Sequence, residues 1–179
     1  YGFPGYKNNF PKQNSFFVDL LIKNGAIIIG KTNSAELGVG GHTINRLFGP
    51  TSNVYDLKKS AAGSSGGAST AVAAGLLPFA DGTDQMGSCR GPAAYSNTYG
   101  FRPTPGLIAS SRIGHNSKLP LLTTPGCFSK NPEDMSIMLD VIVDKNSSDP
   151  YSFNLDGRFK EAFFKDKDLS NIKIGWLSN

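Results

Sequence analysis

The segment of residues 61–106 constrains the fold most, because it holds glycine, serine and alanine at a higher density than a core segment needs. Twice it sets a serine among glycines, as GSSGG at residues 63–67 and as MGSCRG at residues 86–91. Glycine has no Cβ and tolerates positive φ, so both turns allow the backbone to approach a ligand closely. Two such turns in one segment predict a shared active site. From spacing alone, a flexible turn at the first and a helix cap at the second are equally good interpretations.

Length and composition indicate one globular domain spanning residues 1–179. Hydrophobic residues make up 39% of the chain and charged residues 18%, which suits a packed core and argues against disorder. The net charge of +4 is spread along the chain, and no apolar run approaches the roughly 20 residues of a membrane span. We therefore expect neither direct nucleic-acid binding nor membrane insertion. Cys89 and Cys127 alone form no disulfide framework, which favours a cytoplasmic location.

The apolar pattern predicts an α/β fold. Residues 15–23 repeat apolar side chains at helical spacing after Asn14, a candidate cap, and the β-branched run of residues 26–30 predicts a strand covered on both faces. A helix followed by a buried strand is typical of layered α/β proteins. Asn131, followed by proline and two acidic residues, predicts a second helix start. Its expected buried stripe is Met135, Met138, Leu139 and Ile142. Further expected elements are helices at 69–75 and within 153–164, and strands at 76–80 and 172–177.

Three common kinds of site fit the sequence poorly. Residues 25–32 match the phosphate-loop pattern, but their four central positions are the apolar run itself and not a loop that exposes backbone N–H groups. A Ser-His-Asp triad is weakly supported, because no G-x-S-x-G motif occurs and only His42 and His115 are available as bases. Two histidines and two cysteines without short ligand spacing argue against a metal site.

Ser88 is the candidate nucleophile that the residues themselves suggest. It lies at an expected strand-to-helix turn, where successive backbone N–H groups from Gln85 to Ser88 converge on an anion. An oxyanion hole of this kind needs small residues, and Gly87 supplies one. A serine hydroxyl also needs a base, and neither histidine is a convincing one.

Several motifs, in order, resemble the amidase signature family over nearly the whole chain. They are GKTN at 30–33, FGPT at 48–51, GSSGG at 63–67, GTD at 82–84 leading to Gly87-Ser88, Arg90, PAA at 92–94 and GFRPT at 100–104. The resemblance implies a single α/β domain built on a mixed β-sheet, with helices on both faces. It also implies amide hydrolysis by a Ser-cisSer-Lys triad that uses no cofactor and no metal.

Carried over by motif, the resemblance makes Ser88 the nucleophile and Ser64 the bridging serine, with a cis peptide bond before it. It implies an oxyanion hole made by the backbone N–H groups of Gln85, Met86, Gly87 and Ser88. The loop around Gly38 is expected beside the acyl group of the substrate.

The sequence departs from the family pattern in three ways. Ala62 replaces the first glycine of the usual GGSSGG motif. Gln85-Met86 replaces the usual Thr-Gly, and these larger side chains enlarge the wall of the oxyanion loop and narrow the expected substrate range. The family's catalytic lysine lies upstream of the first helix, and neither Lys7 nor Lys31 stands in a matching context. We therefore expect an internal fragment, truncated at both ends and inactive alone.

The predicted function is hydrolysis of a small-molecule amide through an acyl-enzyme on Ser88, with Ser64 relaying protons to a lysine outside the fragment. Two alternatives stay open at this point. One is the amidase subunit of a glutamine-dependent amidotransferase complex, and the other is a non-catalytic family member that acts as a binding protein. A homodimer is also left open.

Overall fold

The computed structural model describes residues 1–110, 122–155, 158–164, 168 and 170–177, so His115 lies outside the described residues. Its elements are η1 (Pro4–Tyr6), α1 (Phe16–Lys23), η2 (Glu36–Gly38), β1 (Ile44–Asn45), β2 (Gly49–Pro50), α2 (Gly66–Ala73), β3 (Phe79–Asp84), α3 (Arg90–Ser96), β4 (Tyr99–Phe101), β5 (Thr124–Ser129), α4 (Pro132–Ile142) and α5 (Phe159–Phe164). None of the helices within these ranges is long and apolar enough to cross a membrane.

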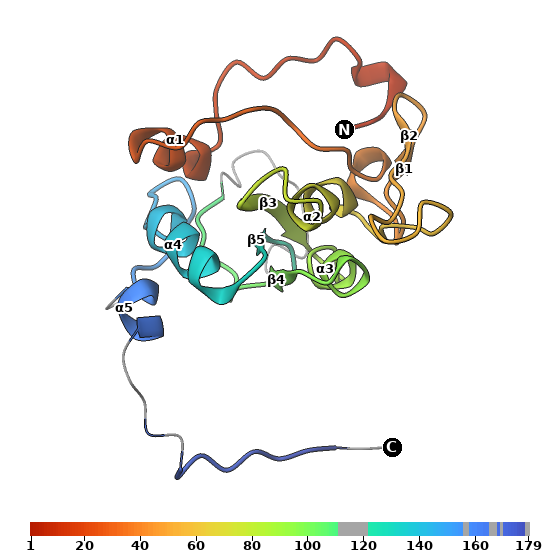
Figure 1. Ribbon diagram of the computed structural model, residues 1–179. Coiled ribbons are helices and arrows are strands. Elements are labelled where there is room, and N and C mark those ends of the chain that lie inside the picture. The colour runs from red at the N-terminus through yellow and green to blue at the C-terminus, as the bar shows by residue number, and fades with distance from the viewer. Residues whose placement is uncertain (111–121, 156–157, 165–167, 169, 178–179) are drawn as a thin grey trace.

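A three-stranded sheet lies between two layers of helices (Figure 1). The central strand β5 pairs antiparallel with β3 on one side and with β4 on the other. In Figure 1, α2 and α3 lie on one side of the sheet, and α4 lies on the other with α1 above it. The predicted α/β class, with helices on both faces of a sheet, is confirmed.

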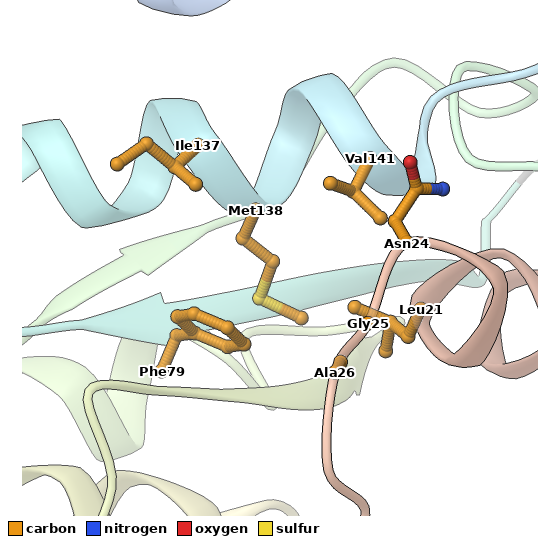
Figure 2. Close-up of a pocket in the computed structure, with 8 residues that line it drawn as sticks. All are labelled: Leu21, Asn24, Gly25, Ala26, Phe79, Ile137, Met138 and Val141. Atoms are coloured by element: carbon orange, nitrogen blue, oxygen red, sulfur yellow. The ribbon is translucent and has the colours of Figure 1, made fainter.

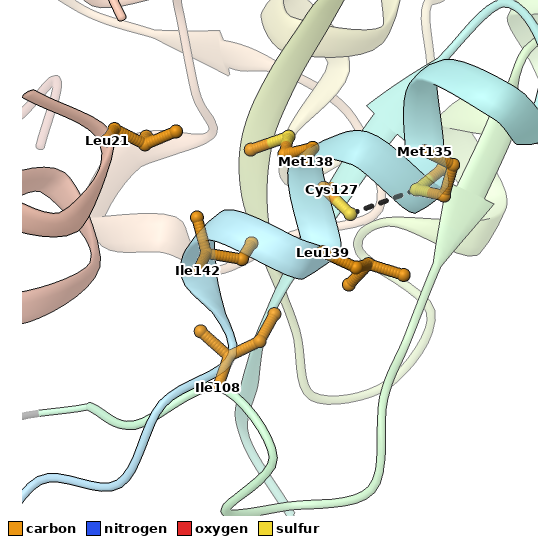
Figure 3. Packing of buried hydrophobic residues seen from close by; sticks show 7 residues of the cluster. All are labelled: Leu21, Ile108, Cys127, Met135, Met138, Leu139 and Ile142. Carbon is orange, nitrogen blue, oxygen red and sulfur yellow. Dashed lines mark hydrogen bonds between the residues drawn. The ribbon is translucent and has the colours of Figure 1, made fainter. Parts of the chain in front are cut away.

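Alternation along β5 explains how one strand supports both layers, because successive side chains of a strand point to opposite faces. Cys127 belongs to a core cluster with α1 and α4, shown in Figure 3, where its thiol donates to the Met135 sulfur at 3.0 Å. Phe128 belongs to a second cluster with residues of α2 and α3. All six residues of β5 are buried, so the strand is the centre of the core.

Helix α4 follows its sequence pattern closely. The Asn131 side chain accepts a hydrogen bond from the Asp134 N–H at 2.7 Å, which satisfies one of the free donors at the helix start. The predicted stripe, Met135, Met138, Leu139 and Ile142, is buried. Helix α1 also forms, but Ser15 occupies its cap position, while the Asn14 amide donates to the Asp19 carboxylate at 2.8 Å. The cap assigned to Asn14 was wrong by one residue.

Helix α2 begins at Gly66, three residues before the predicted start, because tertiary contacts override the poor helix propensity of glycine. The Gly67 N–H donates to the Asn33 carbonyl at 3.2 Å, and a Cβ on Gly67 would lie 2.6 Å from the Asn33 nitrogen. Strand β3 is likewise displaced from the predicted residues 76–80. It runs from Phe79 to Asp84, four residues beyond the predicted end.

The predictions of two buried strands were wrong. Residues 26–30 and 172–177 have no strand assignment, and apart from the half-buried Ala26 their apolar side chains are exposed, with Ile27 at 87% and Trp176 at 85%. A β-branched run favours an extended backbone, but a strand also needs a neighbour to complete its hydrogen bonds. No strand among the described residues pairs with either run.

Candidate functional site

The two serine-containing turns meet beside the end of β3. The Ser65 N–H, in the first turn, donates to the Ser88 carbonyl in the second at 3.3 Å. The Ser65 hydroxyl is 3.3 Å from both the carbonyl oxygen and the nitrogen of Thr83. Ser64 is 3% exposed and Ser88 is half-buried. The structure thus brings together the two turns that contain Ser64 and Ser88.

The backbone around Ser64 is tightly specified. The Gly63–Ser64 peptide bond is cis, as the family resemblance implied, and Ala62 has a φ of 57°. A Cβ on Gly63 would lie 2.7 Å from the carbonyl carbon of His42, so a larger residue does not fit there. The Ser64 carbonyl accepts two hydrogen bonds, from the Ala35 N–H at 3.0 Å and from the Thr43 hydroxyl at 3.2 Å.

Asp84 organises the loop that carries Ser88. Its carboxylate, which is fully buried, accepts the backbone N–H groups of Gly87, Cys89 and Arg90 at 2.9, 3.1 and 3.3 Å. The Arg90 guanidinium pairs with both carboxylate oxygens, and Arg102 Nη1 adds a contact at 3.0 Å. Burial alone would raise the pKa of the Asp84 carboxyl, but Arg90 and the backbone donors outweigh it and hold that pKa well below its usual range.

The loop between Asp84 and Ser88 leaves backbone donors free. The Gly87 N–H donates to the Asp84 carboxylate. Gly87 has a φ of 111°, a backbone conformation that favours glycine. The N–H groups of Gln85, Met86 and Ser88 have no acceptor within the described residues. Free backbone N–H groups that converge in a turn are a common way for proteins to bind anions. The Met86 side chain, 90% exposed, stands on the same loop.

Gly38 belongs to a third segment that approaches the Ser64 turn. Gly38 is exposed at the end of η2, and Leu37 before it has a φ of 57°. The segment is attached through the Ala35 N–H, which donates to the Ser64 carbonyl. The Gly40 carbonyl lies close to Gly63, since it would be 3.0 Å from a Cβ built there. Gly38 therefore lies three residues from a direct contact with the candidate bridging serine.

The described residues supply no base to either serine hydroxyl. No lysine in this part of the chain hydrogen-bonds Ser64 or Ser88, and His42 Nδ1 is instead 2.8 Å from the Ser60 hydroxyl. Within the same ranges no group of three His, Cys, Asp or Glu side chains could hold a metal ion. Burial raises the pKa of the Cys89 thiol, and that of Cys127 to about 12, so neither is available as a thiolate.

A cavity of about 250 Å³ lies away from this chemistry, between α1, α4 and the start of β3 (Figure 2). Its lining is Leu21, Asn24, Gly25, Ala26, Phe79, Ile137, Met138 and Val141. None of these side chains can act as nucleophile, acid or base. The candidate catalytic site is therefore the meeting point of the two serine turns, not this cavity.

Comparison with known proteins decides the family. A family model described as Amidase matches residues 1–179. The chain belongs to the amidase signature family. It is similar to a glutamyl-tRNA(Gln) amidotransferase subunit of Saccharolobus solfataricus, with 37% identity over 94% of this chain and 34% of the relative. It is also similar to an acylamidase of Rhodococcus erythropolis, with 36% identity over 100% of this chain and 37% of the relative.

Solved structures of the amidase signature family give the same result. The structure of a bacterial aryl acylamidase of this family matches 84% of the chain and 31% of its own length, with a TM-score of 0.79 and 34% identity. That of 6-aminohexanoate cyclic dimer hydrolase matches 87% of the chain and 33% of its own length, with a TM-score of 0.82 and 28% identity. The chain thus spans about a third of the length of the relatives it matches.

Sequence reasoning missed two residues that organise this site. Asp84 belongs to the GTD motif at 82–84, but no role was predicted for it. An acidic side chain directly before a glycine-containing loop is the feature that could have indicated its role. Thr43 carried no signal, because its contact with Ser64 joins segments far apart in the sequence.

Proposed function

We propose that the full-length protein hydrolyses the C–N bond of a small-molecule amide through an acyl-enzyme on Ser88. The observation that carries the proposal is the hydrogen bond between Ser65 and Ser88, because it joins the two serine turns, and the second of these turns has free backbone donors. The family match supports the reaction class. The proposal includes no cofactor, and the two free buried cysteines favour a reducing, cytoplasmic setting.

In the proposed mechanism, the Ser88 proton passes to the Ser64 hydroxyl, and the Ser64 proton passes to a neutral lysine supplied by a segment outside residues 1–179. Ser88 Oγ then bonds to the amide carbonyl carbon. When the C–N bond breaks, the proton returns through Ser64 to the leaving amine. Water attacks the ester by the reverse route, which releases the carboxylic acid and restores Ser88.

The developing oxyanion is assigned to the N–H groups of Gln85, Met86 and Ser88. Preorganised donors of this kind stabilise the charge that forms on the carbonyl oxygen. The Gly87 N–H, predicted as a fourth donor, is assigned a supporting role, because it already donates to Asp84. Gly38 is assigned to the wall beside the acyl group.

A serine-directed fluorophosphonate tests this proposal on the full-length protein. We expect one adduct, which peptide mass spectrometry places on Ser88, because an activated serine with a formed oxyanion hole displaces fluoride from the reagent and becomes phosphonylated. The Ser88→Ala variant is expected to remain unlabelled. Labelling at another serine, or labelling that persists in Ser88→Ala, would refute the assignment.

A second function is favoured by one specific observation, the 37% identity with an amidotransferase component. In this alternative the same serines release ammonia from glutamine for use within a larger complex. Co-purification of the native protein with partner subunits, together with glutaminase activity that depends on them, would favour it. Turnover of simple amides by the purified single chain favours the hydrolase.

Replacing Met86 by glycine is expected to broaden the substrate range. The Met86 side chain is 90% exposed on the loop that bears the proposed oxyanion donors, where the family pattern has glycine. Removing it opens space beside the acyl group, so kcat/KM for anilides with bulky acyl groups should rise about tenfold relative to acetanilide, the order expected for fitting one or two extra methylenes. A panel of anilides of increasing acyl size measures this ratio. An unchanged ratio would show that Met86 does not face the substrate.

A further inference from the structure

We propose that Thr43 is a positioning residue for Ser64, an assignment that rests on the proposed function, in which Ser64 relays protons. Thr43 directly precedes β1 and is 1% exposed. Its hydroxyl lies between two groups of the serine turn. It accepts from the Gly66 N–H at 2.8 Å and donates to the Ser64 carbonyl at 3.2 Å.

The direction of both hydrogen bonds is fixed by chemistry. A backbone N–H only donates, so Thr43 Oγ1 must be the acceptor toward Gly66. A carbonyl only accepts, so the single hydroxyl proton of Thr43 is committed to Ser64. Because both roles of the hydroxyl are used, the side chain has one hydrogen-bonded orientation at this place. Serine can reproduce both bonds, and valine, which has nearly the same shape, can reproduce neither.

Thr43 holds the turn on both sides of Ser64. Its own N–H donates to the Ala62 carbonyl at 2.9 Å, before the serine, and its hydroxyl binds the Ser64 carbonyl, after it. The Ala35 N–H is the second donor to that carbonyl. The direction of the Ser64 side chain follows from the orientation of these flanking peptide planes. A proton relay needs its hydroxyl within hydrogen-bond reach of both neighbours, so this orientation sets the rate of transfer.

A purely structural role is the competing explanation. Gly66 is the first residue of α2, so the Thr43 hydroxyl also satisfies one of the free N–H groups at the start of that helix. Losing such a contact lowers stability whether or not Ser64 moves. A lower melting temperature therefore does not separate the two roles, and the decisive measurements are kcat and KM well below the melting temperature.

The experiment compares Thr43→Val and Thr43→Ser in the full-length protein, assayed on a simple anilide. Misplacing a catalytic group by about 1 Å costs up to about 100-fold, so Thr43→Val is expected to lower kcat about 30-fold. KM should change by less than about threefold, since substrate binding is untouched. Thr43→Ser should recover most of the rate. If Thr43→Val does not fold, Thr43→Cys, a weaker donor, replaces it with an expected loss of several-fold.

Thr70→Val is the matched control, because Thr70 Oγ1 is a buried threonine hydroxyl on α2 with no hydrogen-bond partner within the described residues. It is expected to keep the wild-type kcat. A Thr43→Val variant with wild-type kcat, or a Thr43→Ser variant as slow as Thr43→Val, would overturn the inference. Ser64→Ala is measured in parallel. If it is slow while Thr43→Val is not, only the role of Thr43 fails; if it keeps full turnover, the proposed relay itself fails.

Discussion

Ser88→Ala is expected to lower kcat for amide hydrolysis by roughly 10⁶-fold in the full-length protein, the order found when a catalytic serine nucleophile is removed. Without the hydroxyl no acyl-enzyme forms, and only the oxyanion donors and substrate binding remain to assist direct attack by water. KM is expected to stay near its wild-type value because Ser88 contributes little to binding the ground state. Initial rates at saturating substrate, with enough enzyme to detect slow turnover, measure the loss.

The control for this prediction is Ser147→Ala, which removes an exposed serine from the loop after α4 and should leave kcat unchanged. Burst kinetics add a second criterion. Wild-type protein should release a stoichiometric burst of amine if deacylation is slower than acylation, and Ser88→Ala should release none under any condition. Turnover by Ser88→Ala within about tenfold of wild type is incompatible with a serine nucleophile at this position.

The sequence located the two serine turns, but it did not indicate the residues that hold them in place. Ser64 and Ser88 stand in short glycine-rich motifs whose spacing is local, and such motifs keep their meaning without knowledge of the fold. The structure brings their turns together through Ser65. What holds these turns is not local. Thr43 binds Ser64 from 21 residues away, and Arg102 binds Asp84 from 18 residues away, so neither contact has a pattern to recognise.

The secondary-structure predictions also succeeded where the signals are local and failed where tertiary contacts decide. Helix α4 was predictable because its cap, its first-turn acids and its apolar stripe all agree within one short segment. Helix α2 starts on two glycines, whose low helix propensity hides the start, and the close contact with Asn33 that requires them is tertiary. The runs at 26–30 and 172–177 have the composition of strands, but composition does not supply a pairing partner.

Asp84→Asn is expected to destabilise the folded protein by about 3 kcal/mol at pH 7, the order found when one partner of a buried ion pair is removed. The Asp84 carboxylate satisfies the N–H groups of Gly87, Cys89 and Arg90 and two guanidinium groups, and it is fully buried. An asparagine has one acceptor oxygen in place of two and turns an N–H₂ group toward the donors that remain. Chemical denaturation of both proteins measures the difference.

Glu36→Gln is the matched control for Asp84→Asn. Glu36 also pairs with an arginine, Arg46, at 2.8 Å, but that arginine side chain is 69% exposed. Exposed ion pairs contribute little to stability, so the control should unfold at nearly the wild-type denaturant concentration. Because Gly87 and Cys89 flank Ser88, Asp84→Asn should also lower kcat in the protein that remains folded, whereas Glu36→Gln should not. Equal destabilisation by both variants would contradict the role assigned to Asp84.

The difference in unfolding free energy between wild type and Asp84→Asn should depend on pH, and this dependence tests the charge of Asp84 directly. Its pKa in the folded state lies below the value of about 3.9 expected for an unfolded aspartate. A depressed folded pKa means that the unfolded state binds a proton first on acidification, so the stabilisation is complete above about pH 4 to 5 and is lost as the pH falls further. Asparagine does not titrate. The difference in unfolding free energy between wild type and Asp84→Asn should therefore be constant from about pH 5 to 8, and shrink progressively below about pH 4. A difference that stays constant down to about pH 3 would mean that packing, and not the buried charge, holds the loop of Ser88.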